Sequence, residues 1–220
     1  MKKSNLSSYL IGLVAIIAMA AGVWLGYQTQ SDNHLQPPQI QGVILPKPKP
    51  LTNIQLLNHD NEAITENSLK GKWSIVFVGY THCPDVCPTT LSVLTQMYSL
   101  MLEQDIAPPQ VVFISIDPER DNPDLLKQYV KYFNPDFIGA TGNNNQLTSV
   151  TQQLNVVYTK VAGTSGDVAA SDYLMDHSST LLLINPDGHL QSYLTAPHTP
   201  MKIIESILFS QEYFKEVHTR

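Results

Sequence analysis

The sequence predicts an α/β domain with a mixed sheet, and three observations lead to this fold class. Residues 73–80 and 111–116 are short, nearly continuous apolar runs rich in β-branched and aromatic residues, typical of strands buried on both faces. Stretches with apolar residues at helical spacing alternate with these runs. Residues 180–184 and 190–194 flank Asn185-Pro186-Asp187-Gly188, whose turn chemistry predicts an antiparallel hairpin. Strands and helices in this order predict a sheet covered by helices.

The predicted strands are short and are bounded by turn residues. At the start of the domain, residues 54–57 and Ile64 enclose His59-Asp60-Asn61, which predicts a small hairpin. In chain order, the expected strands cover residues 54–57, 73–80, 111–116, 137–138, 156–161, 180–184 and 190–194.

The predicted helices each carry an apolar stripe. Apolar side chains recur every three or four residues from Leu91 to Met101, and Pro88 suits the first turn of that helix. The last predicted helix turns Ile203, Ile204 and Ile207 towards the core by the same spacing. In chain order, the expected helices cover residues 89–102, 123–132, 144–154 and 200–214.

The N-terminal part of the chain carries a membrane signal. Residues 9–27 form a charge-free apolar run, and crossing a bilayer takes about 20 residues. Lys2 and Lys3 precede this run, which predicts a cytoplasmic segment at residues 1–8 and a single-pass anchor at 9–27 in a bacterial-type inner membrane. The body of the protein is then exported to the periplasmic side. A cleaved signal peptide is the alternative, because Ala18-Met19-Ala20 has the small-x-small pattern.

The remaining segments follow from composition. Residues 28–50 are rich in proline, which predicts an extended tether without a core of its own. The folded domain is expected at residues 51–214 and a short tail at 215–220. The formal net charge of −6 argues against nucleic acid as a partner, because phosphate binding needs a basic face. The oligomeric state is left open.

Cys83 and Cys87 are the only cysteines, and they lie between the predicted strand 73–80 and the predicted helix 89–102. Open α/β sheets place their sites at the carboxyl ends of strands, and a helix N-terminus favours thiolate. Cysteines four residues apart can form a local disulfide, cycle between dithiol and disulfide, or bind a soft metal. A passive disulfide would stabilise little, because the loop that it closes is short. Spacing alone leaves redox chemistry and metal binding open.

A metal site needs a third ligand, and His177 is the best candidate among the histidines. It directly precedes the buried strand 180–184, where a polar side chain indicates more than a surface role. The alternative is a histidine that caps a loop by hydrogen bonds. His82 neighbours Cys83, but adjacent residues at a strand end tend to point apart. The others are expected at the surface: His34, His59, His189, His198 and His218.

Three segments of the chain resemble the SCO/SenC family of copper proteins. They are residues 71–88, which contain GYTHCPDVCP, residues 115–121 (SIDPERD), and residues 176–188, which begin with DHS and end with PDG. A Cys-x-x-x-Cys pair alone would be a weak signal, and the order and spacing of the three segments make it a strong one. The resemblance covers nearly the whole chain, including the anchor and the tether.

This resemblance implies a thioredoxin-like fold of the glutaredoxin or peroxiredoxin type, with Cys83, Cys87 and His177 as copper ligands. Two thiolates and an imidazole suit Cu(I) and can also accommodate Cu(II). Asp176 is then a candidate for orienting the imidazole, as are the neighbouring carbonyls. The implied function is that of a membrane-anchored copper chaperone. It passes copper by ligand exchange to the binuclear copper site of cytochrome c oxidase subunit II, with no enzymatic turnover.

Two other functions remain open for the same cysteines. A thiol–disulfide oxidoreductase would use Cys83 and Cys87 as a redox pair, joined by a disulfide in one state, to reduce the cysteines of the recipient site. Against it, three residues separate the cysteines where the usual redox motif has two, and His177 has no required role. A redox or copper sensor would use the same site with a signalling partner.

Residues 117–121 (DPERD) have two interpretations. Asp117 followed by Pro118 is compatible with a helix N-cap and a proline at the first helical position. In the functional interpretation, Asp117 lies near the metal or Arg120 docks a partner. The loop over residues 163–176, rich in Gly, Ser and Asp, is expected to rim the site and to move when copper or a partner arrives.

Overall fold

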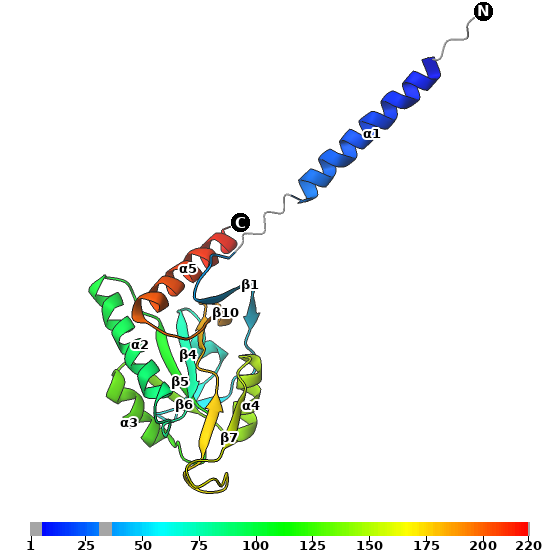
Figure 1. Cartoon of the computed structure of the whole chain (residues 1–220). Helices are drawn as coiled ribbons and strands as arrows, with labels where there is room; N and C mark the ends of the chain where they lie inside the picture. The colour runs from blue at the N-terminus through cyan, green and yellow to red at the C-terminus, as the bar shows by residue number, and fades with distance from the viewer. Residues whose placement is uncertain (1–5, 31–36, 220) are drawn as a thin grey trace, which may run out of the picture. The chain divides into compact units, whose positions relative to one another are not determined.

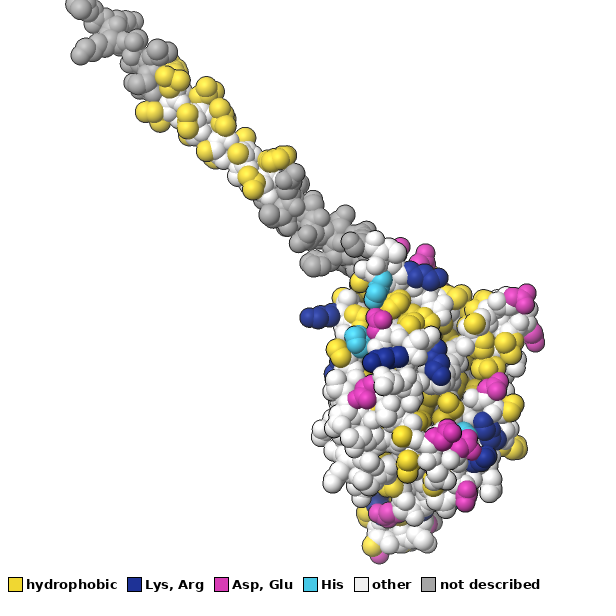
Figure 2. Space-filling view, turned by 180° about the vertical axis from the view of Figure 1, so that it is seen from behind, with side chains coloured by type: hydrophobic (Ala, Val, Ile, Leu, Met, Phe, Trp, Pro, Cys, Tyr) yellow, Lys and Arg dark blue, Asp and Glu magenta, His cyan; other side chains and the backbone are white. Residues whose placement is uncertain are grey.

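The structure, a computed structural model, describes residues 6–30 and 37–219 and divides the chain into two units, Met1–Gln36 and Pro37–Arg220. In the first unit, helix α1 spans Leu6–Gln30 (Figure 1). Large apolar side chains of this helix, from Tyr9 to Leu25, are exposed, and they follow its length in Figure 2.

The predicted membrane anchor finds no support in the described residues. Among them, no helix is both long and apolar enough to cross a membrane. The anchor at residues 9–27, and the exported position of the domain, stay predictions from the sequence. Residues 31–36 of the predicted tether lie outside the described part of the chain.

The second unit is a mixed sheet flanked by helices, as predicted. Its main-sheet strands are Gly42–Pro50 (β1), Leu56–Asn58 (β2), Ala63–Ile64 (β3), Ser74–Gly79 (β4), Gln110–Ser115 (β5), Ile138–Thr141 (β6), Leu181–Ile184 (β9) and His189–Leu194 (β10). The helices are Val86–Glu103 (α2), Pro123–Phe133 (α3), Asn144–Gln153 (α4) and Pro200–His218 (α5), with a short 3-10 helix at Glu66–Leu69. The strand order is β1-β10-β9-β4-β5-β6-β2-β3. Among the strand pairs of this sheet in the described residues, only β4–β5 and β5–β6 are parallel.

The sheet separates two hydrophobic cores, because alternate strand residues point to opposite faces. On β4, Ile75 and Phe77 face one core with buried side chains of α2, α3 and α5. Val76 and Val78 face the other core with those of α4 and of the segment from residue 51 to 69. All six residues of β4 are buried, so this strand is held on both faces. Its carboxyl end, at Gly79, is therefore a rigid starting point for the loop that follows.

The predicted tether is wrong over residues 42–50, which form strand β1. β1 pairs with β10 from Gly42 opposite Leu194 to Pro50 opposite His189, with an irregular register between Ile44 and Lys49. Proline donates no backbone hydrogen bond, so a proline-rich stretch indicates a spacer and not a strand. An edge strand tolerates proline, because one of its sides needs no partner. β1 lies at the edge of the sheet and meets this condition.

Two other expectations are corrected. α5 continues to His218, so most of the predicted tail is helical, and the His218 Nε2 lies 3.0 Å from an oxygen of Asp187. His59 is buried, with 4% of its surface exposed. Its Nδ1 accepts a hydrogen bond of 2.9 Å from the Gly139 N–H, and burial lowers its pKa. His59, which directly follows β2, is thus hydrogen-bonded to strand β6.

A second, separate sheet has two strands, Tyr158–Val161 (β7) and Leu174–His177 (β8). β7 was expected from the sequence, whereas β8 begins inside the predicted loop of residues 163–176. The two strands are antiparallel, with Tyr158 opposite His177. Since no strand of the main sheet pairs with either one among the described residues, this β7–β8 ribbon must be held by side-chain contacts.

Candidate metal centre

The two cysteines lie where β4 passes into α2, as predicted. The Cys83 N–H donates to the Tyr80 carbonyl at 3.3 Å, which folds the loop back on the end of β4. Cys87 belongs to the first turn of α2, and its N–H donates to the Sγ of Cys83 at 3.3 Å. The unpaired N–H groups of a helix N-terminus stabilise a thiolate, and here one of them is aimed at the sulfur.

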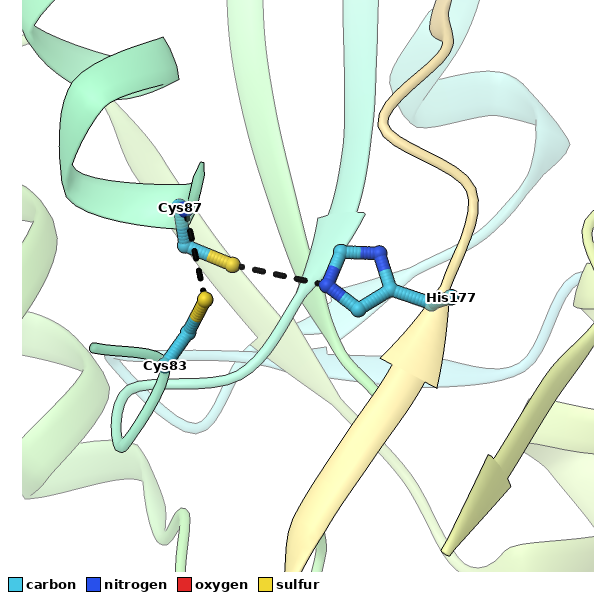
Figure 3. A group of neighbouring side chains, drawn as sticks. All are labelled: Cys83, Cys87 and His177. Atoms are coloured by element: carbon cyan, nitrogen blue, oxygen red, sulfur yellow. Dashed lines mark hydrogen bonds between the residues drawn. The ribbon is translucent and has the colours of Figure 1, made fainter. Parts of the chain in front are cut away.

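His177 completes a group of three possible ligands. It is the last residue of β8, and its Nε2 lies 3.6 Å from the Sγ of Cys87 (Figure 3). One ligand atom from each of Cys83, Cys87 and His177 lies within 4.8 Å of the others. The Nδ1 of His177 lies 3.0 Å from the Ser178 carbonyl oxygen. If Nδ1 carries the proton for this bond, Nε2 turns a free lone pair towards the sulfurs, as a metal ligand requires.

Aromatic rings and a glycine shape the surroundings of the three side chains. The Tyr80 ring meets the imidazole of His177 edge-on at 6.0 Å between centres, and the Phe77 ring lies 6.4 Å away. A Cβ at Gly79 would lie 2.7 Å from the Sγ of Cys87, so glycine leaves the space that this sulfur occupies. Cys87 is therefore tightly enclosed.

One side of the group is open to solvent. A pocket of about 310 Å³ is lined by Cys83 and His177, by Tyr80, Asp85 and Asp176, and by apolar residues of the cysteine loop and the β7–β8 ribbon. These apolar lining residues are Pro84, Val86, Val161, Leu174 and Met175. Val86 and Leu174 are themselves exposed. A metal can therefore be reached from outside without unfolding of the domain.

The two thiols differ in acidity. The pKa of Cys83 is lowered to about 4, chiefly by a hydrogen bond from Cys87 and, against the opposing effect of burial, also by hydrogen bonds from His177 and from the backbone. The pKa of Cys87 is raised, because its thiol donates that hydrogen bond and is buried. At neutral pH the pair therefore shares a single proton, with the negative charge on Cys83.

This difference predicts selective alkylation. At pH 6, iodoacetamide is expected to modify Cys83 at least about tenfold faster than Cys87, because the thiolate is the reactive form. Exposure acts in the same direction, with 8% of Cys83 and none of Cys87 accessible. Mass spectrometry of the digested protein measures the two rates. In urea-unfolded protein the rates should converge, and equal rates in the native protein would contradict the assignment.

Among the other predicted site residues, Asp176 was expected to orient the imidazole of His177, and it makes no such contact among the described residues. It is exposed, and no hydrogen bond joins its carboxylate to His177 among the described residues. Successive strand residues point to opposite faces, so a side chain next to His177 on β8 points away from its ring. The imidazole is oriented by the Ser178 carbonyl, the alternative named from the sequence.

Asp117 and Arg120 form a partly buried ion pair beside the site, and Asp117 is not a helix N-cap. The N-cap of α3 is Asn122, whose side chain accepts from the Leu125 N–H, followed by Pro123 in the first turn. Asp117 is 2% exposed and pairs with the Nε of Arg120. Neither residue belongs to the group of possible ligands.

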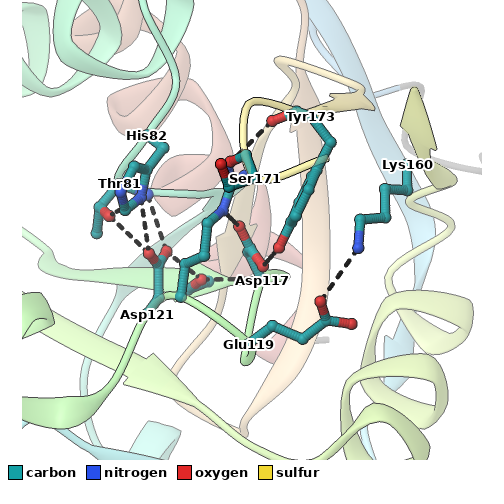
Figure 4. A network of polar contacts seen from close by, with 10 residues as sticks. Thr81, His82, Asp117, Glu119, Asp121, Lys160, Ser171 and Tyr173 are labelled. Atoms are coloured by element: carbon teal, nitrogen blue, oxygen red, sulfur yellow. Dashed lines mark hydrogen bonds and ion pairs between the residues drawn. The ribbon is translucent and has the colours of Figure 1, made fainter. Parts of the chain in front are cut away.

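Sequence reasoning missed Asp121, which holds the start of the cysteine loop (Figure 4). Its buried carboxylate accepts hydrogen bonds from the Thr81 N–H at 2.8 Å and from the Thr81 hydroxyl at 2.6 Å. The Ser115 hydroxyl donates to it at 2.6 Å. His82 lies 3.6 Å from the same carboxylate and is half exposed, so it is not part of the ligand group, as expected. Ser115 and Thr81 lie 6 and 40 residues from Asp121 in the sequence, so the residues around Asp121 do not reveal these contacts.

The predicted disulfide between Cys83 and Cys87 stays a prediction. No disulfide joins the two cysteines in this structure. The loop that brings their sulfurs close together serves a dithiol, a disulfide or a metal, so the local geometry leaves these states open.

Fold and site together define a thioredoxin-like domain with a Cys2His group suited to a soft metal. Comparison with known proteins makes the family plain. The SCO1/SenC family model matches residues 47–209, and the chain belongs to this family. An SCO2-like protein of Rickettsia felis is 38% identical over 155 residues, which cover 70% of this chain and 73% of that protein.

Solved structures agree with this assignment. ScoI of Arabidopsis thaliana, solved with copper bound, has a TM-score of 0.67 and 32% identity, and the match covers 78% of this chain and 98% of that one. BsSco, described as having a disulfide switch and as a member of the Sco family of cytochrome c oxidase assembly proteins, has a TM-score of 0.59. At 20% identity, over 78% of this chain and 98% of that one, this second match concerns the fold alone.

Proposed function

We propose that this protein is a copper chaperone that holds copper through Cys83, Cys87 and His177. The observation that carries the proposal is the group itself: two sulfurs and an imidazole nitrogen within 4.8 Å of one another, at an open pocket. Thiolate and imidazole ligands suit copper, with the thiolates favouring Cu(I). The copper bound to the related ScoI of Arabidopsis thaliana supports the same choice of metal.

The proposed recipient is the binuclear copper site of cytochrome c oxidase subunit II. Support comes from the family, since BsSco is described as belonging to a family of cytochrome c oxidase assembly proteins. Transfer by ligand exchange needs ligands that a second protein can reach. The exposed side chains of Val86 and Leu174 beside Cys83 and His177 provide an accessible, partly apolar rim for such a contact.

Replacing His177 by alanine tests the proposal. The His177→Ala chain is expected to bind Cu(I) at least about tenfold more weakly than the wild type, a loss of about 1.4 kcal/mol, because one of three ligands is gone. The measurement is a titration of the reduced full chain against a competing Cu(I) chelator. His82→Ala is the matched control: His82 adjoins Cys83 but is not in the ligand group, and its affinity should stay within about twofold of wild type. Unchanged affinity in His177→Ala would refute the three-ligand site.

A second function, thiol–disulfide exchange with the cysteines of the recipient, is favoured by the lowered pKa of Cys83. A thiol with a pKa of about 4 is a thiolate at neutral pH and is the more exposed of the two sulfurs. The His177→Ala chain separates the two functions. It should keep reductase activity towards a model disulfide while losing copper affinity, if exchange is an activity of its own.

A further inference from the structure

The His177 ligand is carried by the β7–β8 ribbon, which no strand pairing joins to the main sheet among the described residues. The two cysteines, by contrast, are fixed by β4 and α2, both of which belong to the core. A site made from two separately built parts needs a contact that sets their distance. Lys160 of the ribbon pairs with Glu119, and Tyr80 and Phe77 lie against His177. The contacts of Arg120 differ from these, because they hold the chain at the entry to β8.

Arg120 binds the chain just before β8. Its Nη1 donates to the Ser171 carbonyl at 3.2 Å and to the Tyr173 carbonyl at 3.0 Å. Its guanidinium carbon also lies 3.6 Å from the centre of the Tyr173 ring. A planar guanidinium can make these contacts together, because its donors form a rigid fork and its face stacks on an aromatic ring. Arg120 therefore grips both the backbone and the side chain at the entry to β8.

Asp117 fixes the other end of this contact. Its carboxylate pairs with the Nε of Arg120. It also accepts a hydrogen bond of 2.6 Å from the Tyr173 hydroxyl (Figure 4). Asp117 is 2% exposed, and a carboxylate so deeply buried requires partners. Asp117, Arg120 and Tyr173 thus form a closed triangle in which each side chain restrains the other two.

A second path leads from Arg120 to His177 through Tyr80. The guanidinium carbon lies 5.7 Å from the centre of the Tyr80 ring. The same ring meets the imidazole of His177 edge-on, at 6.0 Å and 85°. Tyr80 directly precedes the cysteine loop and follows the last residue of β4. Arg120 therefore contacts both ligand-bearing parts of the chain: Tyr80, which precedes the two cysteines, and Tyr173, which precedes the histidine.

We propose that Arg120 is a positioning residue that sets the place of His177 relative to Cys83 and Cys87, with Asp117 and Tyr173 as its supports. The proposal rests on the proposed copper site, since it assigns a role in building it. It also accounts for the DPERD motif: Asp121 holds the cysteine loop through Thr81, and Asp117 and Arg120 hold the ribbon. One short segment thereby joins both ligand-bearing parts.

A double-mutant cycle with His177 tests the proposal on the reduced full chain, by competition titration with Cu(I). Arg120→Lys keeps the positive charge beside buried Asp117 but loses the planar fork. We expect it to lower the Cu(I) affinity about tenfold when His177 is present, in the range typical for groups that orient ligands. In the His177→Ala background the same change should alter the affinity by less than about twofold, because a residue that acts through His177 has nothing left to position.

Lys160→Met is the matched control. The Lys160 ammonium also lies 3.6 Å from the centre of the Tyr173 ring, but its ion pair is with the exposed Glu119. It should change the Cu(I) affinity by less than about twofold. If Arg120→Lys does not fold, Tyr173→Phe, which keeps the ring and all charges, enters the same cycle, with an expected loss of about threefold that again requires His177.

Three outcomes would overturn the inference: no loss with His177 present, an equal loss in both backgrounds, or a loss in Lys160→Met as large as in Arg120→Lys. An equal loss would mean that Arg120 acts on the cysteines or on the stability of the whole domain. The wild-type and His177→Ala chains report on the copper site itself. A failure of the proposed function would appear in that pair, whatever Arg120 does.

Discussion

Replacing Asp121 by alanine is expected to lower the free energy of unfolding by about 3 kcal/mol, because it removes the acceptor of a buried hydrogen-bond network. The Asp121 carboxylate accepts from the Thr81 N–H, the Thr81 hydroxyl and the Ser115 hydroxyl. Alanine would leave these donors without their partner in a site where Asp121 is 1% exposed. The cysteine loop begins at Thr81, so we also expect the Cu(I) affinity to fall about tenfold.

Urea unfolding of the apo protein measures the first effect, and Cu(I) competition measures the second. Asp124→Ala is the control, since Asp124 is an exposed carboxylate in the first turn of α3. It should cost less than about 1 kcal/mol, the range of a charge near a helix N-terminus, and should leave copper binding unchanged. Equal destabilisation by the two substitutions would show that the network around Asp121 does not hold the loop.

The substitution Gly79→Ala is expected to destabilise the protein by about 3 kcal/mol and to displace Cys87. An added Cβ would lie 2.7 Å from the Sγ of Cys87 and 2.8 Å from the Cε2 of Phe113, closer than real contacts allow. Both neighbours are fully buried, so neither can move without disturbing the core. Overpacking of a tight core typically costs about 1–3 kcal/mol, and this site lies at the upper end because two contacts are affected.

A second glycine provides the comparison for Gly79. A Cβ at Gly142 would also come close to other atoms, the Oε1 of Gln146 at 2.8 Å and the Cδ2 of buried Leu56 at 3.0 Å, but the closer atom is the far end of a flexible side chain. Gly142→Ala should therefore cost less than about half as much, because the Gln146 side chain can turn away with the loss of one exposed hydrogen bond, to the Asn143 N–H. In Gly79→Ala the Cu(I) affinity should fall with the stability. Wild-type affinity in that variant would mean that the place of Cys87 is not set by the space at Gly79.

The parts of the fold that the sequence predicted correctly are those with a strong local pattern. β4 and β5 are continuous apolar runs, and α2 and α5 carry regular apolar stripes. Local pattern failed for β1, whose prolines are compatible with a spacer and with an edge strand alike. It failed again for β8, where partner strand β7 supplies the pairing and the residues themselves show no apolar alternation.

The site shows a similar division. Cys83, Cys87 and His177 carry distinctive chemistry. Cys87 and His177 lie 90 positions apart, and the resemblance of their motifs to a known family connected them, which spacing alone cannot do. Asp176 was a candidate because it adjoins His177 in sequence. On a strand, however, the side chains of adjacent residues point to opposite faces. Asp121 and Tyr173 escaped notice because their roles depend on contacts across the fold, to Thr81 and to Asp117. The sequence around an acceptor does not reveal which distant donor reaches it.

The separate β7–β8 ribbon has a consequence for the order in which the proposed ligands could dissociate from copper. Cys83 and Cys87 are held by β4 and α2, whereas His177 is held by the ribbon. A small outward tilt of the ribbon would withdraw the nitrogen while both sulfurs stay in place, and no strand pair of the main sheet would have to break. An incoming protein could thus replace one ligand at a time, beginning with the nitrogen of His177, and the metal would never have to be free in solution.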